Sequence, residues 1–452
     1  MDNKQVEVEI TDLAFNGRAV GHLDGKVVFL DGGLPGERVL ARITSSKPRY
    51  DKASVVKILK QSERRVPAVC SHFAYCGGCT WQDLTYHDQL IYKKKQVIDC
   101  LQRIGGLEST LVQEVVGSVE VFRYRNKMEF SFNADTDGSD FTLGLHRQGR
   151  FDEIFDLERC FLTSDVVSDI VRWIRDYVRK AGLTSYNVTN HAGFMRFIMI
   201  RQAKRTADLM VNVVTNYGEM PNRDRFIHEI TAAFPQISTI VHNQNSLKSN
   251  IATGEIETVL FGCGYIEERL FESVFRIRAN SFFQTNTVQT ETLYRIGFDL
   301  LEPRPDQRVL DLYCGTGSIG ILIATYVNEV VGVELVADAV QAARENAHAN
   351  KMQNISFFEG DVKDYLKTCE KTGGRFDSVI VDPPRAGLHP KALRGLSKLR
   401  PEKILYISCN PSTFARDAKE LVAAGYDLPE VRPVDMFPHT MHIELASVFN
   451  RK

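Results

Sequence analysis

Cysteine 409 stands where the chain could carry covalent chemistry. It follows an apolar run, Ile404 to Ser408, and Asp382 follows a second apolar run before Pro383-Pro384-Arg385. The carboxyl ends of parallel strands open onto the ligand sites of α/β sheets. A thiolate at such an edge can add to an electron-poor carbon. The pattern therefore predicts Cys409 as a nucleophile beside a proline-stiffened turn.

A base is expected near this nucleophile. Glu444 opens the final β-run, Leu445 to Phe449, and is the carboxylate that we expect to remove a proton at the same edge. His439 and His442 are weaker candidates. Asp-Pro-Pro followed by an aromatic residue is typical of enzymes that methylate exocyclic amines, but here Arg385 follows and suits a phosphate or a base edge.

A glycine-rich loop predicts a cofactor site. The strand 309–312 is followed by Gly315-Thr316-Gly317-Ser318-Ile319-Gly320, formally the G-x-G-x-x-G pattern of dinucleotide sites. Asp311 would repel a pyrophosphate but attract the ammonium group of S-adenosylmethionine. Glu334 ends the second strand and would accept hydrogen bonds from ribose hydroxyls, as in either kind of site. The charge of Asp311 favours S-adenosylmethionine.

Asp361 ends the third strand of this region. At that position it could reach an adenine ring. A solvent-exposed loop carboxylate would fit the same position equally well.

Three cysteines are packed into one short loop. Cys70, Cys76 and Cys79 enclose Gly77-Gly78, among nine cysteines in all. In a reducing compartment such a cluster indicates a metal rather than disulfides. An iron-sulfur cluster and a tetrahedral zinc ion both suit thiolate ligands, and the spacing alone leaves them equally open.

Composition indicates a multidomain globular protein. The 452 residues carry a formal net charge of -1, and domains average roughly 100 to 200 residues. Between residues 42 and 65 eight basic residues face two acidic ones, which predicts a nucleic-acid surface or a solvated face. The start lacks a secretory signal, and no apolar run reaches the roughly 18 residues of a membrane span, so we expect a cytoplasmic protein with no membrane contact.

Three domains are expected along the chain. Five short β-runs between residues 6 and 60 predict a closed barrel, which resembles the TRAM domain, an OB-like RNA-binding module. Mixed strands and helices then predict an α+β domain, and strand-helix alternation after about residue 270 predicts a Rossmann-like parallel sheet. The expected boundaries are 1–61, 62–270 and 271–452, in an α/β multidomain fold.

Five motifs together resemble the RNA (uracil-C5) methyltransferase family, the m5U enzymes. They are Ser281-Phe-Phe-Gln-Thr-Asn286, Asp311-Leu-Tyr-Cys-Gly315, Asp382-Pro-Pro-Arg385, Ser408-Cys-Asn-Pro411 and His442-Ile-Glu444, and they occur in order over nearly the whole chain. The resemblance implies that Cys409 adds to C6 of uracil and that Glu444 is the base. It also implies that Gln284, Tyr313, Glu334 and Asp382 bind S-adenosylmethionine.

The same resemblance bears on the cysteines and on the substrate. The ribosomal RNA branch of the family carries a [4Fe-4S] cluster on this spacing, with Cys160 matching its fourth ligand; zinc becomes the less favoured occupant. The barrel and the cluster together imply that the substrate is 23S rRNA. We expect the target uridine to lie in a single-stranded loop and to be flipped out of its stack. No obligate protein partner is expected. The alternatives are a tRNA uracil-C5 methyltransferase, an exocyclic-amine methyltransferase, and a non-catalytic RNA-binding or ribosome-assembly protein.

Overall fold

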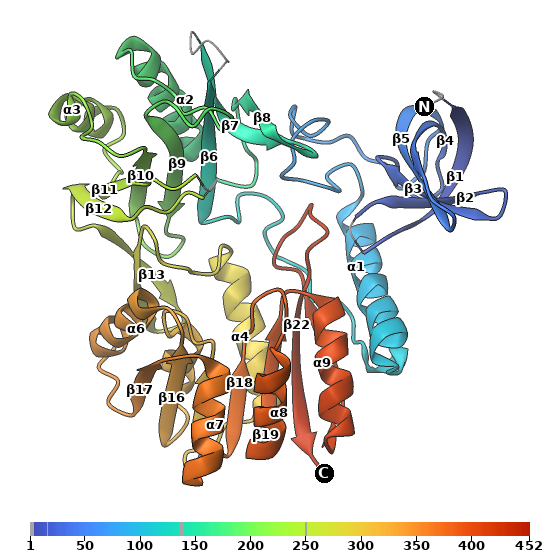
Figure 1. Ribbon diagram of the computed structural model, residues 1–452, viewed down its shortest axis with the longest axis vertical. Helices are drawn as coiled ribbons and strands as arrows, with labels where there is room; N and C mark the ends of the chain where they lie inside the picture. Colours follow the sequence, from blue (N-terminus) through green and yellow to red (C-terminus); the bar gives the residue numbers. More distant parts are fainter. Residues whose placement is uncertain (1–3, 16, 135–139, 249–250) are drawn as a thin grey trace.

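A small closed barrel forms the N-terminal part of the molecule. The computed structural model describes residues 4–15, 17–134, 140–248 and 251–452 (Figure 1). Alternate residues of the first strand point into the barrel, as Val8 and Ile10 do. Gly21 is required where two strands cross closely, because a Cβ there would lie 2.6 Å from the carbonyl oxygen of Glu9. The barrel strands, in the closed order β1-β2-β3-β5-β4, are β1 (Gln5–Leu13), β2 (Ala19–Leu23), β3 (Lys26–Asp31), β4 (Arg38–Ser46) and β5 (Tyr50–Lys60).

The central domain is a seven-stranded sheet in the order β12-β11-β10-β9-β6-β7-β8. Its neighbouring strands are antiparallel except for the parallel pair β10 and β11. Helices α2 (Asp165–Lys180) and α3 (Arg223–Ala233) pack on it through Ile170, Ile174 and Ile230. The strands are β6 (Lys127–Ala134), β7 (Phe141–Arg147), β8 (Arg150–Asp156), β9 (Met195–Gln202), β10 (Leu209–Thr215), β11 (Thr239–Gln244) and β12 (Ile256–Phe261).

A two-stranded ribbon, β13 (Tyr265–Leu270) and β14 (Ser273–Arg278), leads into the C-terminal domain. That domain is an eight-stranded sheet in the order β17-β16-β15-β18-β19-β22-β20, with β21 beside β22. Its strands are β15 (Arg308–Leu312), β16 (Glu329–Glu334), β17 (Ile355–Glu359), β18 (Ser378–Val381), β19 (Lys403–Ser408), β20 (Tyr426–Asp427), β21 (Arg432–Val434) and β22 (Glu444–Arg451). Its helices are α4 (Thr287–Leu301), α5 (Ser318–Ile323), α6 (Ala337–Ala349), α7 (Val362–Thr372), α8 (Pro390–Leu399) and α9 (Pro411–Ala423).

The strand order of this sheet determines where a ligand can bind. The first strand, β15, lies inside the sheet, with β16 and β17 on one side and β18 and β19 on the other, all parallel. Ligands of such sheets bind outside the carboxyl ends of the strands, where the order reverses. The predicted parallel α/β arrangement is confirmed, and an antiparallel strand, β22, is added beside β19.

Helix α1 (Tyr86–Cys100) joins the barrel to the rest of the molecule and lies beside α9 (Figure 1). Its Tyr92 belongs to the hydrophobic core of the barrel, whereas Val97 belongs to the core of the C-terminal sheet. A π-helical turn (Leu101–Gly105) and a 3-10 turn (Ser109–Leu111) follow. Within the described ranges, no helix is long and apolar enough to cross a membrane.

Candidate active site

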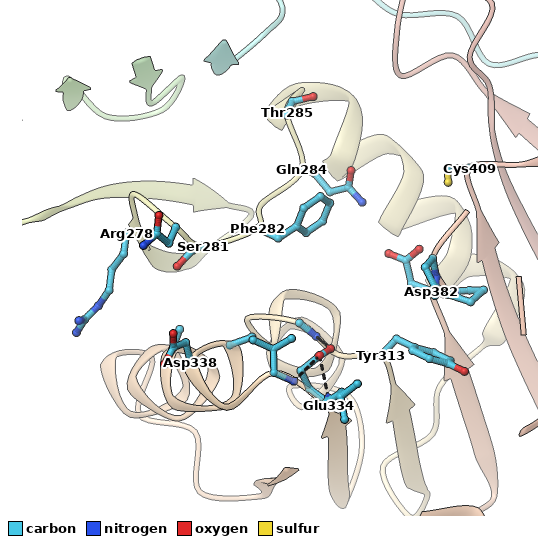
Figure 2. A pocket seen from close by; sticks show the side chains of 18 of the residues that line it. Arg278, Ser281, Phe282, Gln284, Thr285, Tyr313, Glu334, Asp338, Asp382 and Cys409 are labelled. Atoms are coloured by element: carbon cyan, nitrogen blue, oxygen red, sulfur yellow. Dashed lines mark hydrogen bonds between the residues drawn. The ribbon is translucent and has the colours of Figure 1, made fainter. Parts of the chain in front are cut away.

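The loop between β15 and α5 adopts backbone angles that favour glycine. Tyr313, Gly315 and Gly317 have φ angles of 63°, 53° and 79°. A Cβ on Gly317 would lie 2.9 Å from the ring of Phe357, so the packing there requires glycine. The amide of Gly315 donates to Glu334 Oε2 at 3.2 Å, and this bond fastens the loop to the end of β16 (Figure 2).

A cavity of about 1140 Å³ opens above this loop. Gln284 and Phe282 approach it from the segment before α4, Tyr313 and Glu334 from the opposite side, and Asp382 from the end of β18 (Figure 2). The cavity brings together eight of the predicted site residues, namely Gln284, Tyr313, Gly315, Glu334, Asp361, Asp382, Cys409 and Glu444.

Asp311 does not line the cavity. Its side chain is buried beneath the loop, where a Cβ on Gly320 would lie 2.8 Å from Asp311 Oδ2. Desolvation, reinforced by the charge of Asp382, raises the pKa of Asp311 to about 8. We expected Asp311 to attract the ammonium group of the cofactor directly, but the structure places this carboxyl beneath the loop and outside the cavity lining.

Asp361 lines the cavity but also has a structural task. Its carboxylate caps α7, accepting from the amide of Lys363 at 3.0 Å and from Lys363 Nζ at 2.6 Å. One carboxylate has about four acceptor sites, so these two bonds leave it able to accept more.

Strand pairing places Cys409 opposite Glu444. Strands β19 and β22 are antiparallel with Ser408 facing Leu445, so the next position along β19 faces the first residue of β22. Asn410 then begins α9, where its Oδ1 accepts from the amide of Ser412 at 3.0 Å. Its Nδ2 donates to the carbonyl of Arg385 at 2.9 Å, which ties the Cys409 turn to the Asp-Pro-Pro turn. The sheet register therefore creates the predicted pair.

The three acids at this end of the cavity, Cys409, Glu444 and Asp382, all have raised pKa values. Burial raises the pKa of Cys409 to about 11, and the charges of Glu444 and Asp382 act in the same direction while Arg385 opposes them. Burial, followed by the charge of Asp382, raises the pKa of Glu444 well above its usual range. Desolvation raises the pKa of Asp382 to about 7. A base of raised pKa is stronger once deprotonated.

The two histidines occupy different places. His442 lines the cavity, and burial lowers its pKa to about 4, assisted by the charge of Arg385. His439 is outside the cavity lining, stacked on Phe122 at a ring-centroid distance of 4.3 Å. Of the two weaker base candidates, the structure brings only the neutral His442 to the site.

Three further side chains of the cavity were not predicted. Phe282 is 69% exposed, next to Gln284. Arg125 comes from the segment before β6, and its guanidinium lies 5.8 Å from the ring of Phe437, which precedes β22. Phe282 lies inside the 281–286 motif, so its place in the cavity could have been predicted from that motif. No sequence pattern connects Arg125 with Phe437.

The four predicted cluster cysteines surround one small cavity. Cys70, Cys76, Cys79 and Cys160 all line it, with an available volume of about 30 Å³. Burial raises the pKa of Cys79 to about 12, and the charge of Cys160 adds to this effect. Within the part of the chain that the structure describes, no group of three or more His, Cys, Asp or Glu side chains is placed to hold a metal ion.

The basic run on the barrel divides into two groups. Arg65 bonds to the fully buried Glu37 at 2.6 Å and to Asp83, and Arg64 bonds to Asp88 at 2.7 Å. These two arginines join the barrel to the next segment. The other six have no ion pair among the described residues: Arg42, Lys47, Arg49, Lys52, Lys57 and Lys60. Four of these, Lys47, Arg49, Lys52 and Lys57, we call the barrel cations.

Family models match two parts of the chain. Residues 236–452 match the tRNA (Uracil-5-)-methyltransferase model, and residues 1–56 match the TRAM domain model. The first match covers the loop, Asp382, Cys409 and Glu444, and the second covers most of the barrel.

Relatives match along the full chain. An uncharacterized RNA methyltransferase of Chlorobaculum tepidum is 40% identical, covering 99% of this chain and 96% of that protein. Another of Porphyromonas gingivalis is 38% identical over 97% of this chain and 98% of its own. Among solved structures, the Pyrococcus abyssi tRNA (uracil-54, C5)-methyltransferase in complex with S-adenosyl-L-homocysteine has a TM-score of 0.78 at 30% identity, covering 98% of this chain and 100% of that one. The chain thus matches RNA methyltransferases along its full length and a solved tRNA (uracil-54, C5)-methyltransferase in overall structure, and it belongs to the S-adenosylmethionine-dependent RNA (uracil-C5) methyltransferases.

Proposed function

We propose that this protein methylates C5 of a uridine in 23S rRNA, with Cys409 as the covalent nucleophile and Glu444 as the base. The observation that carries the proposal is the pairing of β19 with β22, which sets Cys409 opposite Glu444 in the cavity that also holds the glycine-rich loop. C5 of uracil is a weak nucleophile, and addition of a thiolate at C6 makes it reactive.

The cavity suits S-adenosylmethionine. Gly315, Tyr313 and Glu334 lie on one side of it, Gln284 faces them from the segment before α4, and Asp382 lies between Tyr313 and Cys409 (Figure 2). We assign cofactor binding to these residues, with Asp361 toward the adenine and Asp311 as a support beneath the loop. When bound, the cofactor would supply an electrophilic methyl group.

Each reacting residue has a defined task. Cys409 would first lose its proton to solvent, and the thiolate would then form a bond to C6 while the C5=C6 electron pair moves toward O4. After C5 has gained its methyl group, Glu444 would take the C5 proton; the double bond would re-form and the bond from C6 to sulfur would break, which returns Cys409 as a thiolate. The raised pKa of Glu444 supports this task, because it increases the strength of the base.

A tRNA substrate is the second candidate. The solved tRNA enzyme aligns over 98% of this chain, so possession of the full set of domains does not by itself separate the two substrates. The barrel and the four-cysteine cavity together favour 23S rRNA through the resemblance to the ribosomal branch. Mapping of 5-methyluridine in both RNA classes from cells lacking this protein decides between them.

We also propose that the four cysteines hold a [4Fe-4S] cluster. They surround a common cavity, four thiolates suit either an iron-sulfur centre or a tetrahedral zinc, and the resemblance to the ribosomal branch of the family favours the iron-sulfur centre. Bound there, the cluster would brace the loop that carries Cys79.

Variants of the reacting pair test the proposed chemistry. Cys409→Ala should abolish turnover and form no adduct with RNA, because C6 addition cannot occur. Glu444→Gln keeps the shape but removes the base, so addition and methyl transfer proceed while elimination stalls. The expected species is a protein-RNA complex that survives denaturing electrophoresis and carries label from the cofactor's methyl group.

Other outcomes would favour other functions. Full activity of Cys409→Ala would favour an exocyclic amine as the methyl acceptor. A protein that binds no S-adenosylmethionine in calorimetry would favour a non-catalytic RNA-binding role.

A further inference from the structure

The turn between β21 and β22 leads directly into the proposed base. Val434 pairs with Glu444 as the last pair of that hairpin, and the turn begins at the next residue, Asp435. Phe437 and His442 in the same stretch line the catalytic cavity. A displacement of this turn would therefore loosen the hairpin first at Glu444.

Helix α1 holds the start of the turn through a buried ion pair. Lys93 Nζ lies 2.6 Å from Asp435 Oδ1, and both side chains are 0% exposed. The same Nζ donates to the carbonyl of Phe437 at 3.1 Å, and the hydroxyl of Tyr86 donates to Asp435 Oδ2 at 3.0 Å. The amide of Phe437 closes the arrangement by donating to Asp435 Oδ1 at 3.0 Å.

The end of the turn is held from two sides. The amide of His439, a residue with a φ of 66°, donates to Gln89 Oε1 of α1 at 2.8 Å. The carbonyl of His439 accepts from the amides of Thr80 and Trp81 at 2.8 and 3.0 Å, directly after the cysteine loop. Segments more than 300 positions away in the chain thus hold the turn, as Gln89 and His439 are 350 residues apart.

We propose that Lys93 is a positioning residue for the base: with Asp435 it fixes the turn so that Glu444 meets the C5 proton beside Cys409. A buried ion pair is weak evidence for stability, because an apolar pair of similar volume would be comparably stable. What the pair adds is geometry, since Lys93 Nζ bonds at once to the Asp435 side chain and to the Phe437 backbone. The inference rests on the proposed role of Glu444.

The test uses the full-length double variant Lys93→Met/Asp435→Asn, which removes both charges and keeps the volume. Single-turnover reactions with methyl-labelled S-adenosylmethionine and substrate RNA follow the denaturation-resistant adduct and the free product. Cys409 is held between β19 and α9, where Asn410 fixes its turn through bonds to Ser412 and Arg385 and not through Lys93 or Asp435, so adduct formation and labelling should be unchanged. Release of the product should be about 100-fold slower, the loss expected when a reacting group moves by about 1 Å.

Lys94→Met is the matched control, because Lys94 is the next residue of α1 and pairs with Glu114, whose side chain is 89% exposed. It should release product at the native rate. A merely structural role for the ion pair would lower the melting temperature without accumulating labelled adduct. Native release from the double variant, or a folded, cofactor-binding double variant that forms no adduct, overturns the positioning role.

Two further measurements keep the outcomes separate. If circular dichroism shows that the double variant does not fold, Tyr86→Phe takes its place, because it removes one hydrogen bond to Asp435. Product release from Tyr86→Phe should also be slower than from the native enzyme. Release at the native rate overturns the inference. Glu444→Gln is measured in parallel. If Glu444→Gln forms a labelled adduct and the double variant releases product at the native rate, only the positioning role of Lys93 is overturned. If Glu444→Gln itself releases product at the native rate, the base assignment is overturned, and this inference with it.

Discussion

At the scale of single residues, the site concentrates three acids in one desolvated place. Cys409, Glu444 and Asp382 each have a pKa above its usual value. The charge of Asp382 makes ionisation of Glu444 harder, and the charges of both carboxylates make ionisation of Cys409 harder. Arg385 is the cation that opposes this effect at Cys409 and Glu444. Cys409 is therefore a thiol at rest, and in the proposed mechanism its ionisation would be a separate step.

This arrangement predicts a pH dependence for addition. The pKa of Cys409 is about 11, so the rate of adduct formation should rise with pH through the neutral and alkaline range, as more thiolate forms. Arg385→Gln removes the charge that lowers this pKa. Its pH-rate curve should therefore move to higher pH and its rate at neutral pH should fall.

The measurement is the single-turnover rate of adduct formation between neutral and alkaline pH. Arg394→Gln, an exposed arginine of α8, is the control and should leave the curve in place. A curve that moves to lower pH in Arg385→Gln would contradict the assigned electrostatics.

At the scale of elements, a helix or strand could be predicted from the sequence where its buried residues form a regular apolar pattern. Strands such as β18, buried along its whole length, read as continuous apolar runs, so the parallel sheet and the glycine-rich loop were predictable. Helix α1 was missed, because it contacts several surfaces and buries the polar residues Gln89 and Lys93, which leaves no single apolar stripe.

The same contrast holds within the site. Cys409 and Glu444 come from sequence motifs at strand ends, and the sheet register joins them. Arg125 reaches the cavity from another domain, a tertiary contact that no local pattern records. Asp311 was placed in the binding site by its spacing from the glycines, but packing against Gly320 keeps it beneath the loop.

The barrel strands predict a salt-dependent RNA interaction. Replacement of the barrel cations (Lys47, Arg49, Lys52 and Lys57) by glutamine should weaken RNA binding and flatten its dependence on salt. Each lost phosphate contact removes about 0.9 from the log-log slope for a duplex and about 0.7 for a single strand. Titrations at several salt concentrations measure this slope.

A control of equal charge change uses exposed cations of α7 and α8, at the far end of the C-terminal domain from the barrel (Figure 1): Lys367, Lys371, Lys391 and Arg394. These replacements should leave the slope unchanged. An unchanged slope in the barrel variant would mean that the barrel cations form only a solvated face.

At the scale of the whole molecule, three parts meet behind the catalytic cavity. The turn before β22 is contacted by the cysteine loop, by α1 and by the central domain. The contact from the central domain is made by the hydroxyl of Tyr124, which donates to the carbonyl of Pro438 at 3.0 Å. RNA bound on the barrel must present an unstacked uridine to the cavity, because C6 is inaccessible within a base stack. The enzyme thus depends on how its domains are joined as well as on its reacting residues.

The cysteine cavity predicts a composition that can be measured. Protein purified without oxygen should be brown and contain about four irons per chain, as expected for a [4Fe-4S] centre. Cys160→Ser should lose much of this iron, whereas Cys263→Ser, an exposed cysteine outside the cavity, should retain it. Elemental analysis with about one zinc and no iron would instead identify a tetrahedral zinc site.

The distance along the chain between Lys93 and Asp435, 342 residues, has a consequence for biosynthesis. Chains emerge from the ribosome with the N-terminus first, and contacts of large sequence separation form late. Helix α1 therefore spends most of translation without the carboxylate that its buried amine requires. Because Glu444 lies on β22, which follows the barrel and central-sheet strands in the chain, a nascent polypeptide can complete its barrel and central sheet while the cavity still lacks the proposed base. Assembly of the proposed reacting pair thus has to wait for the synthesis of β22.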